Sequence, residues 1–145
     1  MTNTTEEPAV FTGCVWYQEA YFLKALQQEV DRARDESSPL GLIFLHVPLY
    51  TRGAARHLFA YGQTCDTQTF FGLLSSGDYA ICMPSRDFTV ATQARVALER
   101  AMTGLGAQAG LAMLDEELTA AELLNVSAHA CMRSAHACFE ESNAA

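Results

Sequence analysis

The first periodic pattern in the chain is that of an amphipathic helix. Between residues 15 and 36, apolar side chains such as Phe22, Leu26 and Val30 recur three or four positions apart, and polar or charged residues fill the gaps. Ser37-Ser38-Pro39 follows. Because proline disfavours helical backbone at the residue before it, this tripeptide predicts the end of a helix that spans 15–36.

The next segments carry the pattern of strands around one hairpin. Residues 40–47 form an unbroken apolar run that predicts a strand covered on both faces, and Pro48 ends it. Residues 51–61 predict a short helix with Thr51 as its N-cap. Residues 68–74 and 79–83 then predict two paired strands, with Ser76-Gly77 at the turn between them.

The last third predicts a second helix, a strand and a third helix. Asp87 is placed to cap a helix over 87–102, and Gly104 follows as a stop signal. Residues 107–114 predict a strand. Thr119 and Glu122 have the spacing of a capping box, which predicts a final helix that begins there and runs to about residue 140.

This order of elements predicts an α/β (α+β) fold. Helices alternate with strands around one central hairpin, which is typical of a ferredoxin-like sandwich with a mainly antiparallel sheet and flanking helices. We expect one domain over residues 11–140, with flexible ends at 1–10 and 141–145.

Composition narrows the class of protein. Half of the 145 residues are hydrophobic and 18% are charged, which is typical of a globular domain with a proper core. The apolar runs are too short to cross a membrane, and the N-terminus has no pattern of a secretory signal, so we expect a cytoplasmic protein without membrane insertion. A net charge of −8 argues against nucleic acid as a partner.

The cysteines and histidines do not predict a metal site, and no cofactor is expected. Five cysteines occur without Cys-x-x-Cys spacing, which favours reduced thiols. His129-Ala130-Cys131 repeats as His136-Ala137-Cys138, but seven helical residues separate the two copies by about 10 Å, too far for one ion. The repeat favours a packing or partner-facing stripe.

The predicted hairpin resembles the signature hairpin of GGDEF domains, the bacterial enzymes that make cyclic di-GMP. The family's Gly-Gly-Asp/Glu-Glu-Phe turn reads Ser75-Ser76-Gly77-Asp78-Tyr79 here, and the apolar strand after it ends at Pro84. Other segments resemble the family in the same order: Thr12-Gly13, Ser38-Pro39-Leu40, Ala107–Ala112 and Thr119–Leu124. The resemblance covers residues 11–140 and implies a fold of the nucleotidyl-cyclase palm type.

The sequence departs from the family where the resemblance places the chemistry. The family holds divalent metal with one acid at the end of the first strand and another in the hairpin turn; these places carry His46 and Gly77 here. If the alignment slides by one residue, Asp78 takes the ligand place and Tyr79 replaces the acid after it, so neither register gives a site with two ligands. Residues 37–65 contain no Asp or Glu at all. The family's GTP-contacting segment is replaced by Thr51–His57, and its product-binding Arg-x-x-Asp by Asp66–Thr69. We therefore expect a degenerate GGDEF domain that is not an enzyme.

Three functional hypotheses follow. The first is a regulatory or scaffold module in bacterial signalling that binds a protein partner through exposed Trp16 and Tyr17, with a homodimer through the first helix as a possibility. The second is a receptor for GTP or cyclic di-GMP that binds through Arg52 and Arg56. The third is an enzyme with a new site formed by His46 and Asp78.

The candidate ligand contacts lie in two groups. Arg52 and Arg56 share a helical face after the first strand, where arginine suits phosphate. The alternative is a solvated helix face or a contact for an acidic partner. Ser75, Ser76 and Asp78 in the turn are the other candidates.

Overall fold

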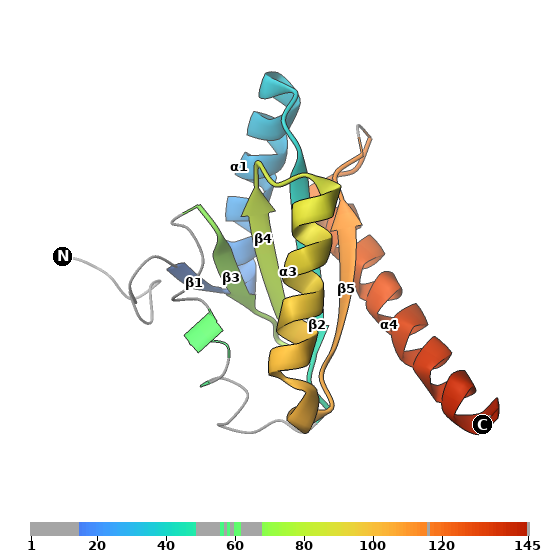
Figure 1. The fold of residues 1–145 in the computed structure, drawn as a ribbon. Helices are drawn as coiled ribbons and strands as arrows, with labels where there is room; N and C mark the ends of the chain where they lie inside the picture. Colours follow the sequence, from blue (N-terminus) through green and yellow to red (C-terminus); the bar gives the residue numbers. More distant parts are fainter. Residues whose placement is uncertain are drawn as a thin grey trace.

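The structure of the protein is a computed structural model, and it describes residues 15–48, 56, 58, 60, 61, 68–115 and 117–144 (Figure 1). The side chains of Thr103 and of residues 134–144 are not included in the description. Several expectations fall outside these residues: the flexible ends at 1–10 and at 145, the Thr12-Gly13 motif, and the segment around Thr51 and Arg52.

Five strands form one mixed sheet in the order β1-β3-β4-β2-β5. The strands are β1 (Val15–Gln18), β2 (Leu40–His46), β3 (Phe70–Leu73), β4 (Tyr79–Pro84) and β5 (Gln108–Met113). The four strands from β3 to β5 pair antiparallel in the order of a ferredoxin-like sheet, and β1 is added parallel to β3. The predicted fold class is confirmed.

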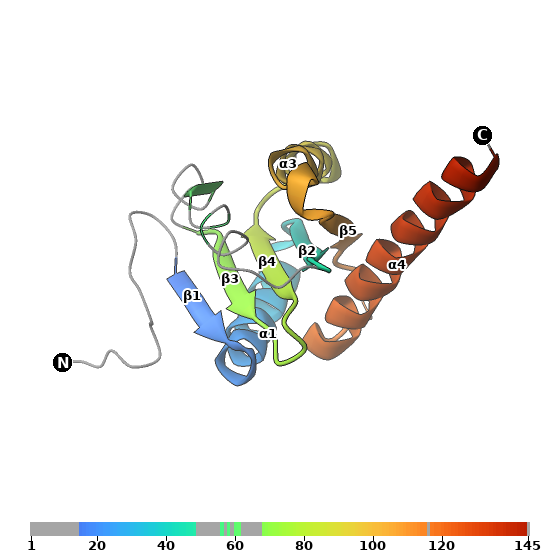
Figure 2. The same ribbon diagram turned by 90° about the horizontal axis from the view of Figure 1, so that it is seen from below.

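Helices cover both faces of this sheet. The helices are α1 (Glu19–Glu36), α3 (Phe88–Ala101), a 3₁₀ turn (Thr103–Leu105) and α4 (Ala120–Ala144). Figure 2 shows α3 on one face and α1 with the beginning of α4 on the other, while the C-terminal half of α4 extends away from the sheet. In the described part of the chain, no helix has the length and apolar character that crossing a membrane requires.

Three helix ends lie where the sequence predicts them. Asp87 caps α3, because its side chain accepts a hydrogen bond of 2.9 Å from the Val90 N–H. In the capping box of α4, the Thr119 N–H donates to Glu122 Oε1 at 2.8 Å, and the Glu122 N–H donates to the Thr119 hydroxyl at 3.3 Å. Ser37 ends α1 in the left-handed conformation, with φ of 54°.

The core has two parts, one on each face of the sheet. On the α3 face, alternate residues of the central strands such as Ile43, Leu45 and Ile81 pack against Leu98. On the other face, Leu42 and its neighbours pack against α1 and α4. Strand β2 is therefore covered on both sides, as its unbroken apolar run predicts.

The prediction of helix from residue 15 is wrong for its first four positions. Residues 15–18 form β1, which pairs with β3 from Val15↔Phe70 to Gln18↔Leu73. The expected exposure of Trp16 is wrong as well, because the side chain is 2% exposed and its ring stacks on Phe71 at 4.4 Å. Tyr17 is half-buried and meets Phe70 edge-on. Two more aromatic rings thus complete the core at the β1 edge.

Candidate functional site

The hairpin turn between β3 and β4 is a tight loop closed by two backbone hydrogen bonds. Gly77 donates its N–H to the Leu74 carbonyl at 2.9 Å, and the Leu74 N–H is bonded to the Asp78 carbonyl at 2.9 Å. Gly77 has φ of 92°, a conformation that glycine adopts without strain. The turn therefore needs a glycine at this position for its backbone alone.

His46 and Asp78 form a pair across the end of the sheet. The register of β2 and β4, with Leu45 opposite Tyr79, places these two residues directly opposite each other. His46 Nδ1 lies 2.7 Å from Asp78 Oδ1, and the Ser76 hydroxyl donates to Asp78 Oδ2 at 2.8 Å. Both carboxylate oxygens therefore have a partner within the protein.

Glu19 holds the other side of the turn. Its Oε1 accepts hydrogen bonds from the Ser75 N–H at 2.8 Å and from the Ser75 hydroxyl at 2.9 Å. Glu19 is the first residue of α1, directly after β1. Sequence reasoning did not identify it, because 56 residues separate it from Ser75 and only the pairing of β1 with β3 brings them together.

The described side chains at this end of the sheet do not form a preorganised cluster of ligands for a magnesium ion. Mg²⁺ prefers an octahedron of oxygen ligands with one or two carboxylates. Asp78 supplies one carboxylate, which is already bonded to an imidazole and a hydroxyl. Among the described residues, no three His, Cys, Asp or Glu side chains lie close enough together to hold a metal ion.

Two cavities lie on either side of the His46–Asp78 pair. One, of about 430 Å³, is lined by the turn residues Leu74–Asp78 together with His46–Pro48. The other, of about 440 Å³, is mostly apolar and lies between Phe44 and Gln108 on the sheet and Cys131 and Met132 on α4. The pair forms part of the wall of both cavities, and the His46 side chain is 46% exposed.

Cys131 in the second cavity is a buried thiol rather than an activated nucleophile. Its Sγ donates to the Gln108 carbonyl at 3.3 Å. Burial raises the pKa of the Cys131 thiol to about 11, although the His46 backbone N–H acts in the opposite direction. The His46–Asp78 pair therefore has no thiolate beside it at neutral pH.

The structure brings some of the sequence-predicted site residues together and not others. Ser75, Ser76 and Asp78 share the wall of the first cavity. Arg56 is helical and exposed, whereas Arg52 lies outside the described residues. His46 and Asp78, which the third hypothesis assigns to one site, are in contact. Tyr17 remains a candidate partner contact, and the burial of Trp16 removes it from the surface.

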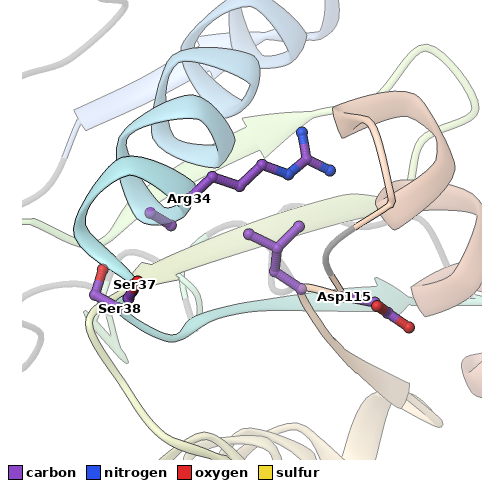
Figure 3. A pocket seen from close by; sticks show the side chains of 6 residues that line it. Arg34, Ser37, Ser38 and Asp115 are labelled. Carbon is purple, nitrogen blue, oxygen red and sulfur yellow. The ribbon is translucent and has the colours of Figure 1, made fainter.

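A larger cavity, of about 500 Å³, lies at the opposite end of the sheet. Figure 3 shows it between the end of α1, with Arg34, Ser37 and Ser38, and Asp115 after β5. The Arg34 guanidinium donates to the Leu118 carbonyl. This arginine therefore ties the end of α1 to the loop before α4.

Comparisons with known proteins agree with this architecture. No family model and no curated protein matches the chain. Among solved structures, it is similar to a sensory box/GGDEF family protein from Caulobacter crescentus, with a TM-score of 0.71, 14% identity, and coverage of 83% of this chain and 94% of that one.

Two further solved structures are similar. The GGDEF domain of DgcB from Caulobacter crescentus, in complex with c-di-GMP, has a TM-score of 0.72 and 11% identity over 94% of this chain and 93% of that one. Diguanylate cyclase SiaD from Pseudomonas aeruginosa, in complex with its activator SiaC, has a TM-score of 0.68 and 12% identity over 83% of this chain and 55% of that one. The chain therefore has the fold of a GGDEF domain.

Proposed function

We propose that this chain is a GGDEF-fold regulatory or scaffold module of bacterial signalling that does not form cyclic di-GMP and acts through a protein partner. The observation that carries the proposal is the histidine at the end of β2. His46 stands at the end of the first strand of the ferredoxin-like unit and bonds the carboxylate of Asp78. An imidazole in that place gives Mg²⁺ no oxygen ligand and holds the nearest carboxylate away from it.

A protein partner is supported by two features. Glu19 bonds the Ser75 N–H and hydroxyl, and His46 and Ser76 bond the Asp78 carboxylate, so these groups of the turn have partners without a nucleotide. SiaD, which has a similar domain, is found in complex with its activator SiaC. We infer that this fold accommodates protein partners and that the present chain uses it in this way.

The test is a product assay. The purified chain is incubated with GTP and either Mg²⁺ or Mn²⁺, and cyclic di-GMP is measured by chromatography, with SiaD as the positive control. We expect no product, because the chain offers one bonded carboxylate where the reaction needs metal held beside the phosphates. Formation of cyclic di-GMP above the level of an enzyme-free sample would refute the proposal.

A second candidate function is a nucleotide receptor without turnover. It is favoured by the cavity of about 430 Å³ beside Ser75, Ser76 and Asp78, and by the bound c-di-GMP in the DgcB domain. A receptor predicts that GTP or cyclic di-GMP raises the melting temperature in a saturable way. It also predicts that the joint change Arg52→Ala and Arg56→Ala abolishes this rise. If neither nucleotide shifts the melting temperature, the protein-interaction proposal stands alone.

A further inference from the structure

The outer edge of β5 carries backbone groups that no described strand pairs. Strand β5 is the last strand of the sheet and pairs only with β2 among the described residues. The Leu114 N–H donates to the Leu40 carbonyl at 2.8 Å, which fixes the alternation of the antiparallel ladder. Residues 108, 110 and 112 therefore bond inward, and the backbone groups of Ala109, Leu111 and Met113 point outward.

Most of these outward groups have no partner among the residues that the structure describes. Glu99 Oε2 accepts the Ala109 N–H at 2.9 Å and so closes one end of the edge. No described residue bonds the N–H groups of Leu111 and Met113. Protein sheets ordinarily protect such edges with charges, proline or a bulge. Residues 108–113 contain no charge or proline, and their register with β2 is continuous.

A groove runs along this edge between two helices. It has a volume of about 400 Å³ and is lined by Phe88 and Thr92 of α3, by Ala109–Leu111 of β5, and by Ala130 and Arg133 of α4. Phe88 is 65% exposed and gives the α3 side of the groove an apolar surface. The Thr92 hydroxyl is buried without a hydrogen-bond partner among the described residues.

The charge at the groove is opposite to that of the chain as a whole. The net charge of the protein is −8, yet two arginines line this groove. Arg95 is bonded to Glu99 at 3.0 Å, whereas Arg133 is exposed and forms no ion pair with any described side chain. A ligand with negative charge on the α4 side would supply the missing partner.

We propose that the outer edge of β5 binds an extended, acidic segment of a partner protein as an additional strand. Its backbone pairs with the N–H and C=O groups of Leu111 and with the N–H of Met113. Since side chains alternate along a strand, every second residue lies toward Phe88 and is apolar, and the residues between them lie toward Arg133 and are acidic. This inference rests on the proposed function and names the surface that would carry it.

A second copy of this chain is the weaker candidate for the same edge. Its own β5 would add the sequence Gln108–Met113, which has no acidic side chain to pair with Arg133. An acidic segment provides both the backbone groups and the charge. The experiment below separates the two occupants.

The test uses a phage-displayed library of random ten-residue peptides selected on the whole chain. We expect enrichment of sequences that alternate apolar and acidic residues. Synthetic copies of these peptides should bind Arg133→Glu about tenfold more weakly than the wild type, because the attractive charge becomes repulsive. Arg100→Glu, the same charge change at an exposed site of α3 outside the groove, is the matched control and should bind as the wild type does.

Amide hydrogen exchange locates the bound peptide. We expect slower exchange at Leu111 and Met113 on binding, and weaker binding by Leu111→Pro, which lacks the outward N–H. If that variant fails to fold by circular dichroism, Arg133→Glu and the exchange data carry the test. No enrichment, unchanged exchange at both amides, or self-association through β5 in place of peptide binding would overturn the inference. None of these results bears on cyclic di-GMP formation, whose detection would instead refute the proposed function.

Discussion

At the scale of single residues, Gly110 determines how closely α4 approaches the sheet. A Cβ atom at this position would lie 2.1 Å from the Cys131 backbone N and 2.5 Å from the Ser127 carbonyl oxygen. Both atoms belong to the backbone of α4, so no side-chain movement could relieve the contact. The short distance between α4 and β5 depends on this glycine, and it shapes the cavity at Cys131.

We expect Gly110→Val to destabilise the protein by more than about 3 kcal/mol, because α4 must move away from β5 and its buried contacts are lost. The free energy of unfolding is measured by urea denaturation. Gly104→Val is the matched control, since a Cβ there has no atom within 4 Å. Equal losses in the two variants would contradict this account of the contact.

At the scale of elements, the short strand β1 joins the N-terminal part of the chain to the hairpin. It pairs in parallel with β3, places Trp16 on Phe71, and delivers Glu19 to the turn. A strand of four residues thus contributes both to the core and to the candidate site. Its loss would loosen both together.

Trp16→Ala is expected to cost about 3–5 kcal/mol of unfolding free energy, because a fully buried indole and its stacking are removed. Tyr21→Ala is the control on the neighbouring helix. Tyr21 is 51% exposed, and its loss should change stability by no more than about 0.5 kcal/mol. The unfolding free energies of both variants are measured by chemical denaturation. A small loss of stability in Trp16→Ala would instead favour the exposed partner contact that the sequence predicts for Trp16.

Local chemistry explains which elements the sequence predicts correctly. The caps at Asp87 and Thr119 and the glycine turn at Gly77 are decided by neighbouring residues, so they are visible in the sequence. Strand β1 is not, because four residues are too few to separate a two-residue period from a helical one. The sequence pattern therefore predicts helix over residues 15–18, where the structure has β1.

The candidate site was only partly predictable for a different reason. His46 and Asp78 were recognised as departures from a family pattern, and the strand register then places them opposite each other. The bond from Ser75 to Glu19 depends on which strand lies beside β3, and no local pattern encodes that. The groove beside β5 likewise results from the packing of α3 and α4 and has no signature in the sequence.

At the scale of the whole molecule, two buried thiols make the free energy of unfolding depend on pH in the alkaline range. Burial raises the pKa of Cys131 from 9.0 to about 11, and burial raises the pKa of Cys82 in the same direction. Below about pH 9 both thiols are protonated in the folded and the unfolded chain, so stability is unaffected. Above it, the unfolded chain releases protons that the folded chain retains, and folding loses stability as the pH rises toward 11.

We therefore expect the free energy of unfolding to decrease between about pH 9 and pH 11, and to decrease less in Cys131→Ala than in the wild type. Urea denaturation at a series of pH values measures both curves. The two proteins are compared as differences from their own values at neutral pH, which removes the effect of the lost side chain. Parallel curves would show that the Cys131 thiol keeps an ordinary pKa in the folded state.

Helix α4 is much longer than the strand that supports it. Its 25 residues extend over about 37 Å, whereas the six residues of β5 extend over about 20 Å. Its first half is held at Gly110, and the second half extends beyond the sheet (Figure 2). An isolated helical segment of that length is marginal in water. We therefore expect the second half of α4 to unwind locally without unfolding of the domain, which faster amide hydrogen exchange in that half than in the first half would show.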